Sequence, residues 1–195
     1  MTALPMKRVF IVHGWGGSPE SNWIPWLIGR LRDSGFEAHA LHMPNAIDPK
    51  MGEWVAFLSN TVKNPDINTY LVGHSLGCQT ILRYLESLGE GKIIGGVLLV
   101  AGFFTIKKEV MFGDTARVLE PWVNSKIDLA AARSHAKRFV LILSDNDPYI
   151  PLGDSEIFEK GLGSKIIIMR GAGHLSASEG YRELHTALNE LLKMV

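Results

Sequence analysis

The fold is decided by residues 69–88, which read TYLVGHSLGCQTILRYLESL. The first five of them, Thr69–Gly73, form a short, mostly apolar run that predicts a buried strand. From Leu76 to Leu88, apolar residues fall on most sides of a helical projection, which predicts a buried helix ending at Gly89. Ser75 therefore lies at a sharp turn from a strand into a helix, the junction that recurs in parallel sheets.

The alternation of strands and helices continues in both directions from this stretch. It predicts an α/β fold, a three-layer sandwich with helices on both faces of a mainly parallel six-stranded sheet in the order 2-1-3-4-5-6. The predicted strands are Arg8–Val12, Glu37–Leu41, Thr69–Gly73, Gly95–Ala101, Phe139–Leu143 and Lys165–Met169. The predicted helices are Pro25–Asp33, Gly52–Lys63, Leu76–Leu88 and a last helix that opens at the capping-box pair Ser176 and Glu179 and continues to Val195.

The length of 195 residues predicts one domain, residues 1–195, because no repeat or linker divides the sequence. One connection, residues 102–138, is longer than a simple strand–helix–strand unit requires. Connections of this length in a compact domain usually serve a site, so residues 102–138 are expected to form at most a small cap.

Charge and composition exclude several classes of partner. Lys and Arg number 20 and Asp and Glu number 20, so the formal net charge is +0, which disfavours nucleic acids and anionic membranes. No protein partner is indicated, and the single cysteine, Cys78, excludes an internal disulfide and a Cys-rich zinc site. No apolar run is long enough to span a bilayer, and Met1–Arg8 does not resemble a secretory signal. A cytoplasmic protein is expected.

Ser75 is the candidate nucleophile, because Gly73-His74-Ser75-Leu76-Gly77 fits the pattern G-x-S-x-G. The pattern occurs often by chance, but here it coincides with the predicted strand-to-helix turn. Small residues at 73 and 77 allow the backbone to turn sharply, and the helix N-terminus offers free N–H groups to negative charge. The alternative is a glycine-rich turn with an ordinary capping serine.

A serine hydroxyl needs a base and an orienting acid within reach. His174 is the candidate base, because it follows the sixth strand in the flexible run Gly171-Ala172-Gly173-His174. Asp147 is the candidate acid, because it follows the fifth strand and Pro148 fixes the loop after it, with Asp145 as the alternative. The chain order Ser, Asp, His is the order expected of an α/β-hydrolase.

The oxyanion of an acyl-transfer intermediate needs donors already in place, and we expect the backbone N–H groups of Leu76 and Trp15 to supply them. Trp15 lies in the glycine-rich loop 13–18, which lacks the spacing and the lysine of a phosphate-binding loop. Candidates for the pocket wall are two histidines beside the turns and large apolar residues of the long connection: His13, His74, Phe103, Phe104, Met111, Phe112 and Trp122.

These motifs together resemble the α/β-hydrolase superfamily over almost the whole chain. The stretch from Ser18 through Trp23 to Leu27 is most similar to the small serine hydrolases related to retinoblastoma-binding protein 9. The resemblance implies a compact α/β-hydrolase with a minimal cap, in which Ser75 is the nucleophile of the nucleophile elbow. It also implies Asp147 as the orienting acid and His174 as the base of a catalytic triad.

The expected function is a serine hydrolase, a carboxylesterase-like enzyme that cleaves a small-molecule ester, with a thioester or an amide as alternative substrates. No metal and no organic cofactor are expected, because serine, imidazole, carboxylate and water supply all the groups that this chemistry requires. Two other functions remain open. One is a non-catalytic protein-binding module with the same fold, and the other is a lipase for longer acyl chains.

Overall fold

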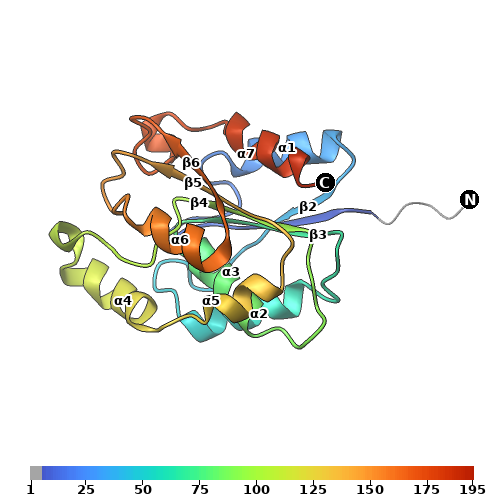
Figure 1. The fold of residues 1–195 in the computed structure, drawn as a ribbon. Coiled ribbons are helices and arrows are strands. Elements are labelled where there is room, and N and C mark those ends of the chain that lie inside the picture. The colour runs from blue at the N-terminus through green and yellow to red at the C-terminus, as the bar shows by residue number, and fades with distance from the viewer. Residues whose placement is uncertain (1–5) are drawn as a thin grey trace, which may run out of the picture.

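The structure is a computed structural model that describes residues 6–195, and one six-stranded sheet organises it (Figure 1). The strands lie in the order β2-β1-β3-β4-β5-β6, and every neighbouring pair is parallel. Their bounds are β1 Arg8–Val12, β2 Glu37–Ala40, β3 Thr69–His74, β4 Gly96–Val100, β5 Phe139–Ser144 and β6 Lys165–Met169. The predicted sheet and its strand order are confirmed.

Helices cover both faces of the sheet, with α1 and α7 on one face and α2, α3, α5 and α6 on the other (Figure 1). Helix α4 lies farther out on the second face. The helices are α1 Ile24–Asp33, α2 Met51–Thr61, α3 Leu76–Glu86, α4 Gly113–Asn124, α5 Leu129–Ser134, α6 Asp154–Leu162 and α7 His185–Lys193.

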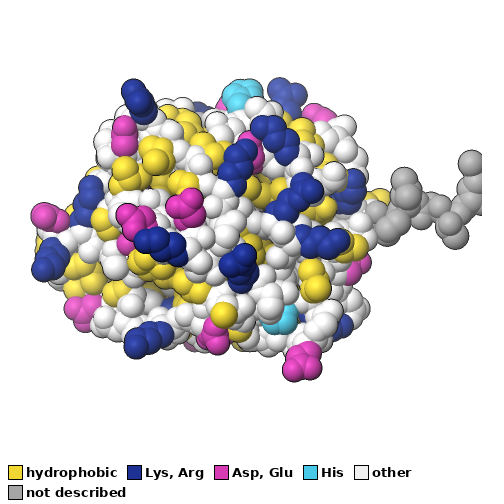
Figure 2. Space-filling view, in the orientation of Figure 1, with side chains coloured by type: hydrophobic (Ala, Val, Ile, Leu, Met, Phe, Trp, Pro, Cys, Tyr) yellow, Lys and Arg dark blue, Asp and Glu magenta, His cyan; other side chains and the backbone are white. Residues whose placement is uncertain are grey.

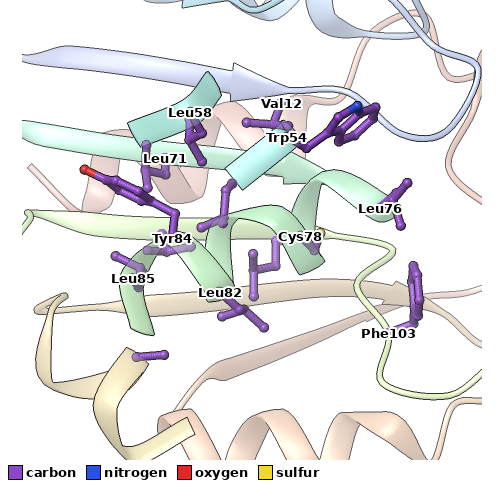
Figure 3. Close-up of a cluster of buried hydrophobic side chains, with 14 of the residues drawn as sticks. Val12, Trp54, Leu58, Leu71, Leu76, Cys78, Leu82, Tyr84, Leu85 and Phe103 are labelled. Atoms are coloured by element: carbon purple, nitrogen blue, oxygen red, sulfur yellow. The ribbon is translucent and has the colours of Figure 1, made fainter. Parts of the chain in front are cut away.

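Each face of the sheet has its own apolar core, because successive strand residues point to opposite faces. In β3, Leu71 packs in the core under α2 and α3, whereas Val72 packs in the core under α1 and α7. Figure 3 shows part of the first of these cores, with Trp54 of α2 beside Val12 of β1 and with Leu82 and Tyr84 on α3. Strands covered on both sides are apolar throughout, which explains their continuous hydrophobic runs.

The last helix was predicted wrongly. The capping box of Ser176 and Glu179 is present, but it caps only a short 3-10 turn, Ala177–Glu179. Gly180 ends this turn with a φ of 92°, and the helix begins only at His185. A local capping signal thus marked a real turn without showing how far the turn would extend.

Residues 102–138 form no separate layer but a 3-10 turn, Lys108–Val110, followed by α4 and α5. Pro121 lies inside α4. The sequence patterns missed these helices and also α6.

None of the helices in residues 6–195 combines the length and the apolar character needed to cross a bilayer. On the face shown in Figure 2, acidic and basic side chains are intermingled. Met1–Pro5 belong to the segment that was compared with a secretory signal, and they lie outside the described residues.

Gly77 fixes the distance between α3 and β1. A Cβ at this position would lie 2.2 Å from the carbonyl oxygen of Val12 and 2.8 Å from that of His13. We expect Gly77→Ala to push α3 off the sheet and to lower the free energy of unfolding by about 3 kcal/mol or more. For a chain of this size, that corresponds to a fall in melting temperature on the order of 10 °C.

The matched control for this substitution is Gly29→Ala, because nothing lies within 4 Å of a Cβ at Gly29 in helix α1. Alanine favours a helix over glycine by roughly 0.5–1 kcal/mol, so Gly29→Ala should keep or raise the melting temperature. Thermal melts followed by circular dichroism compare the two variants. A Gly77→Ala protein that melts like the wild type would contradict the proposed packing constraint.

Candidate active site

Ser75 occupies the single position between β3 and α3, in a backbone conformation that side chains rarely adopt. Its φ is 52° and its ψ is −116°. The Ser75 N–H donates to the carbonyl of Val100 at 2.9 Å, and the Ser75 carbonyl accepts from the N–H of Cys78 at 2.9 Å. A Cβ at Gly73 would lie 2.8 Å from the backbone nitrogen of Cys78. The neighbouring glycines therefore permit the strained turn, and the two hydrogen bonds hold it.

A cavity of about 480 Å³ opens above Ser75 at the carboxyl ends of the strands. Its lining comes from the segments that follow β1, β3, β4, β5 and β6, and it includes Ser75, Leu76 and His174. Because β1 and β3 are neighbours and the chain continues from them to opposite sides of the sheet, the connections after them diverge and leave a crevice. The serine thus lies where this fold creates space for a ligand.

Asp147 and His174 form a hydrogen-bonded pair. Nδ1 of His174 lies 2.8 Å from Oδ2 of Asp147, and the side chain of Asp147 is almost fully buried. The other oxygen, Oδ1, accepts the N–H groups of Tyr149 at 2.8 Å and Ile150 at 3.1 Å. Since a carboxylate only accepts, the proton must lie on Nδ1 of His174, which leaves Nε2 as an acceptor in the neutral ring.

The hydroxyl of Ser75 makes no hydrogen bond to His174 or to any other side chain or backbone group in residues 6–195. The two residues meet as neighbours in the lining of one cavity. Hydrogen bonds between a nucleophile and its base are commonly long before a substrate is bound and shorten in the complex. The structure brings the serine and the imidazole to one place and leaves the serine hydroxyl free.

Asp145, the alternative acid, does not contact His174. Its Oδ1 accepts the N–H of Gly171 at 2.8 Å, and Asp145 is exposed. The side chain between the two aspartates, Asn146, accepts the N–H of Gly173 at 2.7 Å through Oδ1. The loop after β5 therefore holds the loop that carries His174, and only Asp147 reaches the imidazole.

Glu179 holds the backbone on both sides of His174. Oε1 accepts the N–H of His174 at 2.7 Å, and Oε2 accepts the N–H of Ser176 at 3.0 Å. A Cβ at Gly173, whose φ is 57°, would lie 2.2 Å from Oε1, so only glycine leaves room for this carboxylate. Burial opposes ionisation of Glu179, but the hydrogen bonds from His174 and Ser176 outweigh it and lower the pKa of the carboxyl. Glu179 is therefore an anion at neutral pH.

His74 also contacts the loop that carries His174. Its Nε2 donates to the carbonyl of His174 at 3.0 Å, and its ring meets the edge of Trp23 at 5.8 Å between centroids. Trp23 in turn donates from Nε1 to the carbonyl of Leu175 at 3.1 Å. Burial, together with the neighbouring His174, lowers the pKa of His74 to about 3, so this ring stays neutral. His74 thus holds the loop of His174 through a hydrogen bond from a neutral ring, and it also lines the cavity.

The N–H groups of Trp15 and Leu76 donate no hydrogen bond within the described part of the chain, and both residues line the cavity. The adjacent N–H groups are already used, since Gly16 donates to Ala46 at 2.8 Å and Gly17 to Gly14 at 3.1 Å. A Cβ at Gly14 would lie 3.1 Å from the Cβ of Ser75, so this loop lies directly against the serine.

Of the residues expected in the pocket wall, His74 and Phe103 line the cavity, and five do not: His13, Phe104, Met111, Phe112 and Trp122. His13 is buried, with its Nε2 accepting the N–H of Met43 at 3.3 Å. Phe104 packs on Phe158 at 4.4 Å between ring centroids, and Trp122 packs on Trp54 at 6.0 Å. Met111 packs against the core, and Phe112 is 71% exposed.

The lining residues that the sequence patterns missed include Leu119 and Thr115 of α4, which lie four positions apart on one side of the helix. Leu119 also belongs to the apolar core, together with Val118 and Trp122, which do not line the cavity. The large side chain of Trp122 suggested a pocket wall, but which residues of α4 line the cavity depends on how this helix docks. The spacing of four between Thr115 and Leu119 is the signal that could have grouped them on one side of the helix.

This chain is similar to known proteins over almost its whole length. A family model described as serine hydrolase matches residues 9–193. The Bacillus subtilis protein YdeN is 34% identical over 178 residues, which cover 91% of this chain and 90% of YdeN. Its crystal structure superposes with a TM-score of 0.88 over 97% of this chain and 98% of that chain.

Two more distant proteins are similar over most of their length. The serine hydrolase RBBP9 of Rattus norvegicus is 23% identical over 192 residues, 97% of each chain. Est1E from Butyrivibrio proteoclasticus is 15% identical, with a TM-score of 0.70 over 99% of this chain and 90% of Est1E. This likeness shows a shared fold.

Proposed function

Because this chain belongs to the serine hydrolase family and has the α/β-hydrolase fold, we propose that it cleaves a carboxylic ester of a small molecule through an acyl-enzyme at Ser75. The observation that carries the proposal is the convergence of Ser75, His174 and the buried Asp147 at one cavity. These three side chains come from the ends of three different strands. The parallel sheet brings these strand ends to one edge, and the cavity at that edge gathers the three side chains.

In the first half of the reaction, Oγ of Ser75 attacks the acyl carbon while its proton passes to Nε2 of His174. Asp147, already bonded to Nδ1, stabilises the imidazolium that results. The bond between the acyl carbon and the alcohol oxygen then breaks. His174 returns the proton to that oxygen, so the alcohol leaves neutral and Ser75 keeps the acyl group.

In the second half, a water molecule replaces the alcohol. Its proton goes to Nε2 of His174 as its oxygen bonds to the acyl carbon, and the bond to Ser75 breaks as His174 returns the proton to Oγ. The carboxylic acid leaves and the enzyme is restored. In both halves the oxyanion would lie against the free N–H groups of Trp15 and Leu76, at the N-terminus of α3.

A fluorophosphonate probe, which reacts with an activated serine, tests this proposal against the rival of a non-catalytic binding module. We expect the wild-type protein to be labelled at Ser75, and we expect His174→Ala to slow labelling by at least about 100-fold, the typical contribution of a general base. Ser134 is an exposed serine on α5 that does not line the cavity, so Ser134→Ala is the control and should be labelled like the wild type. Labelling that does not depend on His174 would favour the binding module.

A further inference from the structure

The cavity has two chemically different walls. One wall is mainly apolar and consists of residues from the segments after β4 and β5: Phe103, Ile106, Val110, Leu119 and Ile150, with the hydroxyl-bearing Thr115 and Tyr149 among them. The other wall is polar and includes residues from the segments after β1 and β6: Ser21, Asn22, Ser176, Ser178 and Glu179. A ligand that fills the cavity therefore meets mostly hydrocarbon on one side and hydroxyl, amide and carboxylate groups on the other.

The two walls stand over opposite faces of the sheet. Phe103 and Leu119 belong to the core under α2 and α3, whereas Trp23 and Leu175, which flank the polar wall, belong to the core under α1 and α7 (Figure 1). The polar wall is also tied together across the chain. The N–H of Ala177 donates to Oδ1 of Asn22 at 2.9 Å, and Trp23 bonds the carbonyl of Leu175.

Among the described residues that line the cavity, histidines aside, one carries a charge at neutral pH, and it is the anion Glu179. No lysine or arginine lines the cavity within residues 6–195. An anionic group placed in the polar wall would meet this carboxylate without a cation to compensate it. The polar wall is therefore suited to a neutral polar group.

The wall also has hydrogen-bonding capacity to spare. Nδ2 of Asn22 donates to no group within the described residues, since only its Oδ1 is engaged, by Ala177. The hydroxyl of Ser178 shares one hydrogen bond of 2.7 Å with Ser176 and is otherwise exposed to solvent. Both groups remain available to the hydroxyls of a ligand.

The position of the imidazole decides which wall takes which half of an ester. His174 must return a proton to the alcohol oxygen, so the alcohol has to leave on the His174 side of the acyl carbon. The polar wall begins at Ser176, two residues after His174 in the same loop. The alcohol therefore lies along the polar wall, and the acyl group lies along the apolar wall.

We propose that the substrate is an ester of an apolar acyl group with a neutral alcohol that carries further hydroxyls, such as a polyol. Alcohols that carry a carboxylate or a phosphate are disfavoured by Glu179. This inference rests on the serine hydrolase chemistry proposed above. It adds to that chemistry the identity of the two halves of the substrate.

The test compares kcat/KM for three butyrate esters with the same acyl group: glycerol 1-butyrate, 1-propyl butyrate and 3-butyrylglycerate. We expect kcat/KM of the glycerol ester to exceed that of each other ester by about tenfold. Relative to the propyl ester it gains roughly one hydrogen bond between neutral groups, and relative to the glycerate ester it avoids the repulsion between two carboxylates. The penalty on the glycerate ester should shrink as salt rises. Equal values for the three esters would overturn the inference.

Two variants then separate the walls. Glu179→Gln should raise the glycerate-to-glycerol ratio of kcat/KM by about fivefold to tenfold. The ratio is taken within one variant, so any loss that both substrates share through a loosened His174 loop cancels. Glu156→Gln removes the same charge from the exposed face of α6 and should leave the ratio unchanged.

The apolar wall is tested by Leu119→Trp, which fills space on the α4 side. We expect this variant to lower activity on octanoate relative to acetate esters several-fold while the glycerol-to-propyl ratio stays as in the wild type. A change in both ratios would contradict the division into two walls. A wild-type protein that is not labelled by the fluorophosphonate and hydrolyses no ester would instead reject the proposed function. Failure of the proposed function is thus distinguishable from failure of the proposed substrate class.

Discussion

Replacing Ser75 by alanine is expected to lower kcat toward p-nitrophenyl butyrate by about six powers of ten, the size of loss that follows removal of a serine nucleophile in proteases. Without Oγ no acyl-enzyme forms, and the base and the oxyanion donors have no group to act on. The nearest other nucleophile does not replace it. Cys78 lies on the buried side of α3, and burial raises the pKa of its thiol, which keeps it protonated.

The measurement needs a control for folding, because Ser75 lies in a strained turn. Alanine keeps the Cβ and both backbone hydrogen bonds of this position, so the melting temperature should stay within a few degrees of the wild type. Activity is followed under single-turnover conditions with the protein in excess. A correctly folded Ser75→Ala protein that retained more than about 1% of the activity would disprove the mechanism.

Asp147→Asn is expected to lower kcat by about four powers of ten, as the corresponding change does in a serine protease triad. The asparagine amide donates where the carboxylate accepted, so it favours the imidazole tautomer that carries its proton on Nε2. A His174 in that tautomer cannot take the proton of Ser75. The bonds of Oδ1 to Tyr149 and Ile150 remain possible, so the loop keeps its shape.

Asp145→Asn is the matched variant, because it makes the same chemical change two residues away. Within residues 6–195, the carboxylate of Asp145 accepts one hydrogen bond, from the N–H of Gly171, which an amide oxygen also accepts. We expect less than a tenfold loss in kcat from Asp145→Asn, measured on the same ester beside Asp147→Asn. If the two variants lost activity equally, or in the reverse order, the assignment of Asp147 as the orienting acid would be wrong.

The sheet could be predicted from the sequence because its signals are short in range. The buried run before Gly73 and the helical run after Leu76 specify strand, turn and helix within 20 residues of chain. The order of the strands follows from how parallel units connect. These local signals agree with the final fold, so little tertiary information was needed.

The cavity walls could not be predicted in the same way. Whether an apolar residue of residues 102–138 faces the core or the cavity depends on how α4 docks, and the sequence patterns did not resolve α4 at all. Trp122 shows the consequence, because its size suggested a pocket wall and its docking buries it against Trp54. The role of Glu179 was hidden for a related reason, since its capping-box pattern did not reveal that it also holds His174.

The hydrogen bonds between the loop after β6 and residues near the start of α1 have a consequence for biosynthesis. A ribosome delivers Trp15 and Ser75 early, but His174 emerges a hundred residues after His74, which bonds its carbonyl. In the proposed mechanism, a nascent chain therefore holds a serine without its base until β6 docks beside β5 and Leu175 accepts the indole N–H of Trp23. We expect the chain to become reactive only when the last strand has been translated and has joined the sheet.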